Sequence, residues 1–381
     1  MKKILFVVNT SEFFISHRLE IAKSAKDKGF EVHVATAYDQ NSVQKIKREG
    51  FFYHEINFSR KSGNIFRELS TVLSLYALFK KSKPDLVHLI TIKPYLYGGI
   101  AARFAKVPSV VSAVAGLGIL FSSNNLRYKF LRTALYPLFG TAFNHKNQRV
   151  IFQNKDDRDS LLDWGVVSKD KSVMIRGSGV DLRLCPYLPE PEGVPIISFA
   201  ARLLRDKGVA VFAEASRILK SRNVVARFWL IGEPDLGNAN TVTETQLKQW
   251  EATGLVELFG FRQDIPNIFA QSNIVTLPSF YGEGLPKVLV EAAACGRAVI
   301  TTDHPGCRDA IEPDITGLLV PIRDAVALAD SIEDLINNPE KRKLLGQSGR
   351  VLAENTFSIE KIVDAHMKVY EGLLNSAELM K

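Results

Sequence analysis

The chain has 381 residues, enough for two domains with separate cores, and its 46% hydrophobic and 24% charged residues are typical of a globular protein. Its three cysteines have neither paired nor metal-binding spacing, which argues against a disulfide scaffold and favours a reducing compartment. The net charge of +8 is uneven. Residues 1–190 hold 29 Lys and Arg against 16 Asp and Glu, whereas residues 191–381 hold 20 against 25. We therefore expect the first half to meet an anionic partner.

The first half alternates short, β-branched apolar runs with helical patterns, which predicts a parallel sheet covered by helices on both faces. The expected strands are 4–8, 32–36, 53–56, 86–91, 109–114 and 149–153. The expected helices are 18–28, 43–49, 64–81, 97–105 and 126–143. The first apolar run is too short for a signal peptide, and the uncharged stretch 107–126 contains Pro and small residues. No membrane span is therefore expected.

A stretch rich in Gly and Pro then interrupts the alternation of strands and helices. It predicts a linker between domains, placed at 184–195. A second alternating series of strands and helices follows it. The sequence therefore predicts an α/β protein made of two facing doubly wound, Rossmann-like domains with a cleft between them. The domains are expected at 1–183 and 196–358, and a final helix, 359–374, could pack back on the first domain.

Residues 278–296, PSFYGEGLPKVLVEAAACG, combine features of an anion site with hydrogen-bond acceptors. A loop with two glycines precedes Pro286, which suits the first turn of a helix because its missing N–H costs nothing there. The free N–H groups of a helix start favour a phosphate. Glu283 in the loop and Glu291 in the helix can accept hydrogen bonds from hydroxyl groups. A nucleotide sugar, which carries phosphates and hydroxyls, fits this combination.

Two cations follow the first strand of the second half, in the sequence FAARLLRDKG. Arg202 offers a planar fork of donors and Lys207 a point charge, a pair suited to a diphosphate. The pattern is equally compatible with two solvated surface cations.

The order of these motifs, R-L-x-x-x-K-G at 202–208 and E-G-L-P-K-V-L-V-E at 283–291, resembles the retaining glycosyltransferases of family 4, which have the GT-B fold. Residues 275–312 are especially similar to enzymes of bacterial surface-polysaccharide and O-antigen assembly. The first half of the chain resembles this family more loosely, through the segments SHRLEIA, LVHLITIKPYLYGGIAARFAKVP and GSGVD. The resemblance implies transfer of a hexose or N-acetylhexosamine from a nucleotide sugar, with UDP as the expected nucleotide, to a polyprenyl-diphosphate-linked saccharide.

The resemblance also implies roles on the donor side. Arg202 and Lys207 would bind the diphosphate and offset charge on the leaving nucleotide. Glu291 would accept hydrogen bonds from the ribose, and Glu283 would hold the transferred sugar. Arg262 would lie near the base, and backbone N–H groups would complete the phosphate site near Gly284, Leu285, Pro286 and Lys287.

No metal or other cofactor is expected from the resemblance. The one Asp-x-Asp pattern, Asp157 and Asp159, follows a turn and is interpreted as the start of a helix, where carboxylates are favoured by the dipole.

The acceptor side departs from many relatives, which carry a Gly-Gly pair after the first strand and a His after the fifth. This chain has NTSEFF and SAVAGLG there, so no general base is assigned. In a retaining reaction the leaving phosphate can take the acceptor proton, and catalysis then rests on positioning and charge stabilisation. The acceptor-side candidates are His17, Arg18, Arg60, Lys93, Gly116 and Gly118. A local cap or core hydrogen bond explains His17 equally well.

Residues 120–139 place Phe and Leu among Arg127, Lys129 and Arg132, which predicts an interfacial helix on anionic lipid. The alternative is a core helix with a solvated basic face. The expected location is cytoplasmic, peripherally associated with the inner face of the cytoplasmic membrane.

Two other functions stay open at this point: a GT-B-fold sugar-nucleotide epimerase, and a non-catalytic sugar-nucleotide-binding protein with an altered acceptor loop. Nucleic acid is not an expected partner, because aromatic residues are not interleaved with the basic ones.

Overall fold

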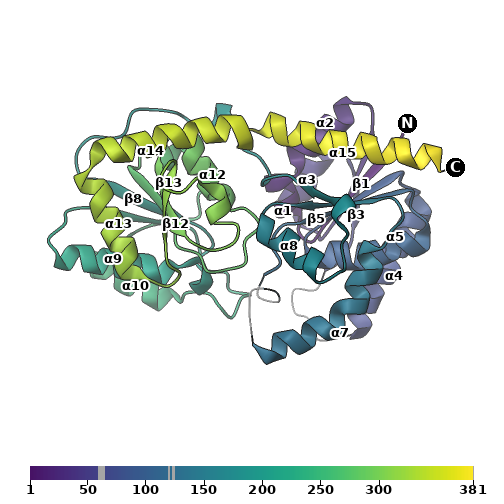
Figure 1. Cartoon of the computed structure of the whole chain (residues 1–381), viewed down its shortest axis with the longest axis horizontal. Helices are drawn as coiled ribbons and strands as arrows, with labels where there is room; N and C mark the ends of the chain where they lie inside the picture. Colours follow the sequence, from purple (N-terminus) through teal and green to yellow (C-terminus); the bar gives the residue numbers. More distant parts are fainter. Residues whose placement is uncertain (59–64, 119–120, 122–124, 381) are drawn as a thin grey trace. The chain divides into compact units, whose positions relative to one another are not determined.

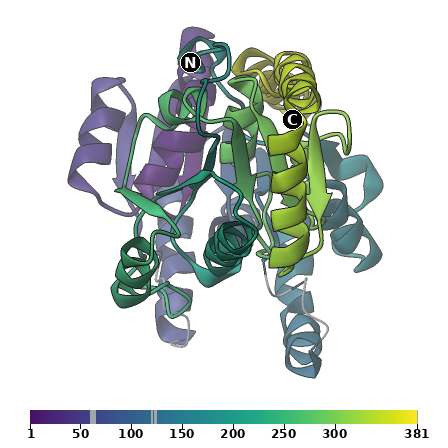
Figure 2. The ribbon, with the colours of Figure 1, turned by 90° about the vertical axis from the view of Figure 1, so that its left-hand side faces the viewer.

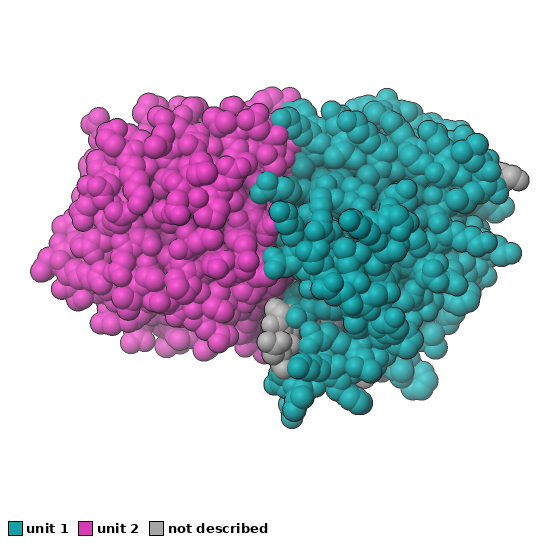
Figure 3. Space-filling model, in the orientation of Figure 1, with its two compact units in different colours: residues 1–178, 360–381 teal, residues 179–359 magenta. Residues whose placement is uncertain are grey.

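A computed structural model describes residues 1–58, 65–118, 121 and 125–380 (Figure 1). They form two compact units, coloured separately in Figure 3: unit 1 is Met1–Ser178 with Glu360–Lys381, and unit 2 is Gly179–Ile359. The division falls at residue 179 and not at 183, because Val180 forms a β-bridge with Ser358 and lies in the core of unit 2. The predicted linker, 184–195, also packs on unit 2, where the buried Arg297 donates to the carbonyl oxygen of Leu188.

Among its described residues, unit 1 contains a parallel sheet of seven strands in the order β3-β2-β1-β4-β5-β6-β7. The strands are β1 (Lys3–Val8), β2 (Glu31–Thr36), β3 (Phe52–Glu55), β4 (Leu86–Ile90), β5 (Ser109–Val114), β6 (Gln148–Phe152) and β7 (Ser172–Met174). Successive residues of β1 enter different apolar clusters, with Leu5 and Val7 in one and Ile4 and Phe6 in the other. The sheet is therefore buried on both faces, as its continuous apolar strands predict. β7 is not among the predicted strands, because three residues carry too little pattern.

The helices of unit 1 follow the predicted alternation, with two additions. They are α1 (Ser11–His17), α2 (Leu19–Asp27), α3 (Gln40–Arg48), α4 (Ile65–Ser82), α5 (Gly99–Ala105), α7 (Leu126–Phe143), α8 (Lys155–Asp163) and α15 (Ile359–Leu379). The first addition is α1, expected as loop; the Thr10 side chain caps it by accepting from the N–H of Phe13. The second is a π-helical segment, η1 (Pro94–Gly98), directly before α5.

The C-terminal helix α15, yellow in Figure 1, belongs to unit 1 and covers a buried polar cluster. The hydroxyl of Tyr370 lies 2.6 Å from Nδ1 of His88 in β4, and both residues are fully buried. Arg18 and His366 are buried beside them, at 1% exposure each. His88 is therefore a core histidine with a buried hydrogen-bond partner.

Unit 2 repeats the architecture with six described strands, in the order β10-β9-β8-β11-β12-β13, all parallel. They are β8 (Ile196–Ala200), β9 (Arg227–Ile231), β10 (Glu257–Gly260), β11 (Ile274–Leu277), β12 (Ala298–Thr302) and β13 (Gly317–Val320). The helices are α9 (Val209–Ser221), α10 (Glu244–Ala252), α11 (Ile265–Ala270), α12 (Lys287–Ala294), α13 (Ala325–Asn337) and α14 (Pro339–Leu352). Between β12 and β13 the chain also forms a 3-10 turn, η5 (Arg308–Ala310).

The helices α4 and α7 extend beyond the rest of unit 1 on the same side (Figure 2). Their first turns expose large apolar side chains: Ile65, Phe66, Leu69 and Leu73 of α4, and Leu126, Phe130 and Leu131 of α7. The buried residues of α7 lie only in its last two turns. Within the described part of the chain, no helix combines the length and hydropathy that crossing a bilayer requires.

Candidate active site

The strand order of unit 2 changes direction between β8 and β11, which are direct neighbours. Parallel α/β sheets bind ligands beyond the carboxyl ends of their strands at such a point. The turn after β8 carries Arg202 and Lys207, and the loop after β11 carries Glu283. Topology alone therefore places the predicted donor residues at the expected position of a site.

Lys207 and Glu283, 76 residues apart in the sequence, form an ion pair. Their side chains are only 13% and 11% exposed. The ammonium also lies 5.4 Å from the centre of the Tyr281 ring, within cation–π range. Gly208 allows the turn after β8 to lie close to the loop after β11. A Cβ at Gly208 would lie 2.2 Å from the carbonyl oxygen of Pro278, and the φ of +84° favours glycine.

A buried hydroxyl that the sequence analysis did not assign joins the same two segments. Oγ of Ser279 lies 3.2 Å from the carbonyl oxygen of Asp206 and 3.0 Å from Oε1 of Glu283. Thr302, the last residue of β12, donates through its hydroxyl to the carbonyl oxygen of Ser279. Gly306 backs the loop, because a Cβ there would lie 2.5 Å from the carbonyl oxygen of Glu283. A small hydroxyl residue just after a strand end is the one signal that could have found Ser279.

The predicted helix is confirmed with a shift of one residue at its start: α12 begins at Lys287, and Pro286, expected in the first turn, is its N-cap. Gly296 has the left-handed φ of +69° expected of a C-terminal cap. In α12, Oε1 of Glu291 lies 3.5 Å from Nζ of Lys287. Burial raises the pKa of Glu291 above its usual value, and the neighbouring Lys287 opposes this rise. Gly284 and Leu285, which precede the helix, are buried.

The two arginines predicted for the donor side are both exposed and paired. Arg202 donates to Oδ2 of Asp235 at 2.9 Å, and 60% of its side chain is accessible. Arg262, after β10, forms a two-pronged ion pair with Asp264 at 2.8 and 2.7 Å. A diphosphate would therefore compete with a carboxylate for Arg202.

The acceptor-side candidates of unit 1 have mixed environments. His17 stacks on Phe13 with ring centres 4.1 Å apart, and Lys93 forms a 2.6 Å ion pair with Glu68 of α4. Arg18 is fully buried, so it does not present its guanidinium on the surface, and desolvation lowers its pKa to about 10. Gly116 and Gly118 follow β5 with φ of +100° and +61°. Arg60 lies outside the described residues.

The Asp-x-Asp pattern marks a helix start, as expected. Asn154 caps α8 by accepting from the N–H of Asp157 at 2.7 Å, and its amide donates to the carboxylate of Asp157 at 2.9 Å. Among the residues that the structure describes, no three His, Cys, Asp or Glu side chains gather in a way that could hold a metal ion.

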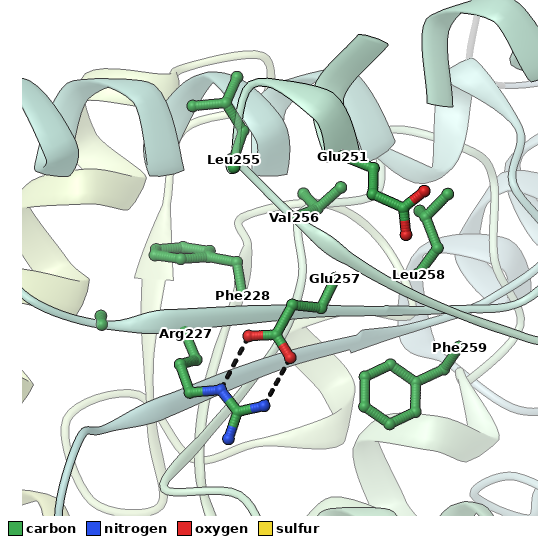
Figure 4. Close-up of a pocket in the computed structure, with 10 residues that line it drawn as sticks. Arg227, Phe228, Glu251, Leu255, Val256, Glu257, Leu258 and Phe259 are labelled. Atoms are coloured by element: carbon green, nitrogen blue, oxygen red, sulfur yellow. Dashed lines mark hydrogen bonds and ion pairs between the residues drawn. The ribbon is translucent and has the colours of Figure 1, made fainter. Parts of the chain in front are cut away.

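A surface pocket at the edge strand β10 and its neighbour β9 lies apart from these residues (Figure 4). Its floor carries a two-pronged ion pair between Arg227 and Glu257 at 2.8 and 2.6 Å. Both residues begin their strands, so the pocket is at the amino ends of the sheet, opposite to the ends where parallel sheets bind ligands. We do not assign it to the active site.

Comparison with known families matches both halves of the chain. Residues 186–352 match the family described as Glycosyl transferases group 1, and residues 3–154 match the family described as Glycosyl transferase 4-like.

Individual relatives agree with these matches. The chain is 27% identical, over 98% of its length and 100% of the relative, to the N,N'-diacetylbacillosaminyl-diphospho-undecaprenol alpha-1,3-N-acetylgalactosaminyltransferase of Campylobacter jejuni. It is 27% identical, over 81% of its length and 80% of the relative, to the UDP-Gal:alpha-D-GlcNAc-diphosphoundecaprenol alpha-1,3-galactosyltransferase of Escherichia coli. The fold is similar to Anabaena Alr3699/HepE, solved in complex with UDP and glucose, with a TM-score of 0.79, 20% identity, and coverage of 97% of this chain and 100% of that one.

Proposed function

The chain belongs to the family 4 glycosyltransferases of the GT-B fold, and on this premise we propose that it transfers a sugar from a UDP-sugar to a saccharide linked to a polyprenyl diphosphate. The observation that carries the donor half is the meeting of Lys207, Glu283 and Ser279 at the switch point of unit 2. The names of the two relatives support the acceptor, because both act on sugars linked to diphospho-undecaprenol. Assembly of a bacterial surface polysaccharide of the O-antigen type would use such a transfer.

Different donor-side residues would bind different parts of the UDP-sugar. The Lys207 ammonium and the Arg202 guanidinium would bind the diphosphate and offset the negative charge that grows on the leaving nucleotide. Glu283 would accept hydrogen bonds from the sugar, and Glu291 from the ribose. In this proposal protein cations and helix N–H groups neutralise the diphosphate, with no metal or other cofactor.

We propose that the reaction retains the anomeric configuration, which agrees with the alpha products in the names of both relatives. A UDP-hexose is alpha-linked, so an alpha product has the same configuration as the donor. The acceptor hydroxyl would attack on the face that the diphosphate leaves, and a phosphate oxygen would take its proton. This route needs no protein base, and it relies on positioning by residues such as Glu283 and Lys207.

The acceptor is expected beyond the carboxyl ends of β1 and β4, where the strand order of unit 1 changes direction. The segments that follow these strands carry His17 and Lys93. Lys93 has a nearby carboxylate, Glu68, which a lipid diphosphate would displace. We propose this edge as the place of the acceptor phosphates.

We further propose that unit 1 docks peripherally on the inner face of the cytoplasmic membrane through α4 and α7. The exposed apolar turns of both helices offer side chains that could enter the headgroup region. The sequence of α7 contains Arg127, Lys129 and Arg132 and no acidic residue, which suits anionic lipid. A second copy of the chain is a poorer occupant, because it would bring these cations together. The proposed surface includes α4 as well as the interfacial helix expected from the sequence of residues 120–139.

The experiment that tests the catalytic proposal is a panel of UDP-sugars incubated with a polyprenyl-diphosphate saccharide, with product detection by mass spectrometry. We expect one donor to give an acceptor heavier by one hexose or N-acetylhexosamine residue. The matched control is the chain with Glu283→Gln, which should bind nucleotide and give little product. Interconversion of UDP-sugars without any acceptor product would instead support the epimerase alternative.

A further inference from the structure

Ser279 stands at a junction between the two segments that form the donor site. It is fully buried, and its Oγ lies within hydrogen-bond distance of two acceptors, the carbonyl oxygen of Asp206 and Oε1 of Glu283. A serine hydroxyl has one hydrogen, so it can donate to only one of them at a time. The same Oγ accepts from the N–H of Tyr281 at 3.2 Å, which holds the oxygen in place whichever acceptor it serves.

Lys207 can also pair with either of two anions, the carboxylate of Glu283 or the diphosphate of a bound donor. Its ammonium is paired with the same Oε1 of Glu283 that faces Ser279. A diphosphate carries more negative charge than a carboxylate, so a donor bound here would draw the ammonium towards its phosphates. The flexible lysine stem allows this turn.

A carboxylate that loses its cation while largely buried is costly unless another donor replaces it. Ser279 can supply that donor without leaving its other acceptor unsatisfied. The carbonyl oxygen of Asp206 already accepts from the N–H of Phe280 at 2.9 Å. The hydroxyl hydrogen can therefore turn to Glu283, and Asp206 keeps a partner.

We propose that Ser279 is a positioning residue, which holds Glu283 in place for the sugar when Lys207 turns from this carboxylate to the donor diphosphate. The proposal rests on the proposed function, because it assigns Lys207 to the diphosphate and Glu283 to the sugar. It adds an order of events: the diphosphate competes with Glu283 for Lys207, and Ser279 and the hydroxyls of the sugar then donate to the carboxylate of Glu283.

The first test replaces the hydroxyl. In Ser279→Ala we expect the affinity for UDP, measured by calorimetry, to stay within about twofold of wild type, and kcat for transfer to fall about tenfold or more, as loss of a hydrogen bond to a charged group implies. Ser279→Thr, which restores the hydroxyl, should recover most of kcat. A purely structural role would lower UDP affinity and kcat together, with a lower melting temperature, and that result would overturn the proposal. Unchanged kcat in Ser279→Ala would do the same.

The second test addresses the competition for Lys207. Glu283→Gln removes the charge that competes for Lys207, so UDP should bind about three to ten times more tightly, a change of up to about one pKa unit in free energy. The matching UDP-sugar should gain less, because the amide is a poorer acceptor for its hydroxyls. Equal or weaker UDP binding would overturn the exchange of partners. If the wild type bound no UDP and transferred no sugar, the proposed function itself would be wrong. If the wild type bound UDP and transferred sugar, and the variants had the same UDP affinity and kcat as the wild type, only this inference would be refuted.

Discussion

The two units share one sheet topology, and they differ in the side chains that lie where the strand order changes direction. In both sheets the strand order reverses beside the first strand, at β1 and β4 in unit 1 and at β8 and β11 in unit 2. In unit 2, side chains that follow the two strands meet, as the pair of Lys207 and Glu283 shows. In unit 1, Lys93 is instead paired with Glu68 of α4, and His17 stacks on a residue of its own helix. Topology therefore indicates where ligands bind, and residue chemistry decides which ligand.

The difference also separates two ways of binding an anion. Unit 2 uses a largely buried cation, whose interactions are strong because little water surrounds it. In unit 1, α7 exposes Arg127 and Lys129 next to apolar side chains, which suits a broad surface of charged headgroups. We expect single substitutions to be severe in unit 2, and combined substitutions to be needed in unit 1.

The largest effect is expected at Lys207. Lys207→Ala should lower kcat/KM for transfer about 100-fold to 1,000-fold, the range for removing one preorganised charge from a developing anion. Arg205→Ala, an exposed cation in the same turn, is the matched control and should stay within about threefold of wild type, as is usual for an exposed cation. If both variants behaved alike, the distinction between buried and exposed cations would be wrong.

The next largest effect concerns membrane binding by unit 1. Reversing Arg127, Lys129 and Arg132 to Glu should weaken binding to vesicles with anionic lipid about 100-fold or more, since each basic side chain near such a surface contributes about 1 kcal/mol. Sedimentation with vesicles measures this effect.

The control for the reversal comes from the same unit. Reversal of Lys45, Lys47 and Arg48 on α3, which lie at its exposed C-terminal end, changes the charge equally without touching α7. We expect vesicle binding to fall much less. Equal losses would mean that net charge, and not the α4 and α7 surface, governs binding.

The smallest of these effects is expected at Glu291, and it depends on pH. Glu291→Gln should weaken UDP binding about tenfold at neutral pH, because a charged acceptor is replaced by a neutral one. Burial raises the pKa of Glu291, so wild-type affinity should fall as pH drops through that raised value, and the variant should lack this step.

Stability should move in the opposite direction with pH. A carboxyl whose folded pKa is raised contributes stability that is fully present below its unfolded pKa, about 4.5, and is lost as pH rises through the folded value. Wild type should therefore lose stability relative to Glu291→Gln over this window in thermal melts. A constant difference across the window would contradict the assignment of a buried, ionising carboxyl.

The secondary structure around the donor-side candidates could be predicted well because its signals are local. Pro286 before an apolar helical pattern marks the start of α12, and Gly296 marks its end. The cations after β8 follow a recognisable strand. The role of Ser279 was not predicted, because a single serine in a loop has no periodicity and one of its partners, Asp206, lies in a segment 73 residues away in the sequence.

The acceptor side was harder because burial there depends on distant parts of the chain. Arg18 reads as a surface cation in its own segment, yet it is buried near Tyr370, some 350 residues later, once α15 packs on unit 1. The helix α1 was missed since seven residues carry little pattern, and its start depends on the Thr10 cap. Local sequence patterns report helices and strands better than they report long-range burial.

The return of α15 to unit 1 has a consequence for synthesis of the chain. Unit 2 is contiguous, so its core can close as soon as residue 359 has left the ribosome. Unit 1 is made first, yet until its last helix arrives it exposes the faces of β1 and β4 that Tyr370 and Met367 cover. The half of the protein that begins the chain is therefore the half that finishes folding last, and a truncated chain would leave unit 1 incomplete.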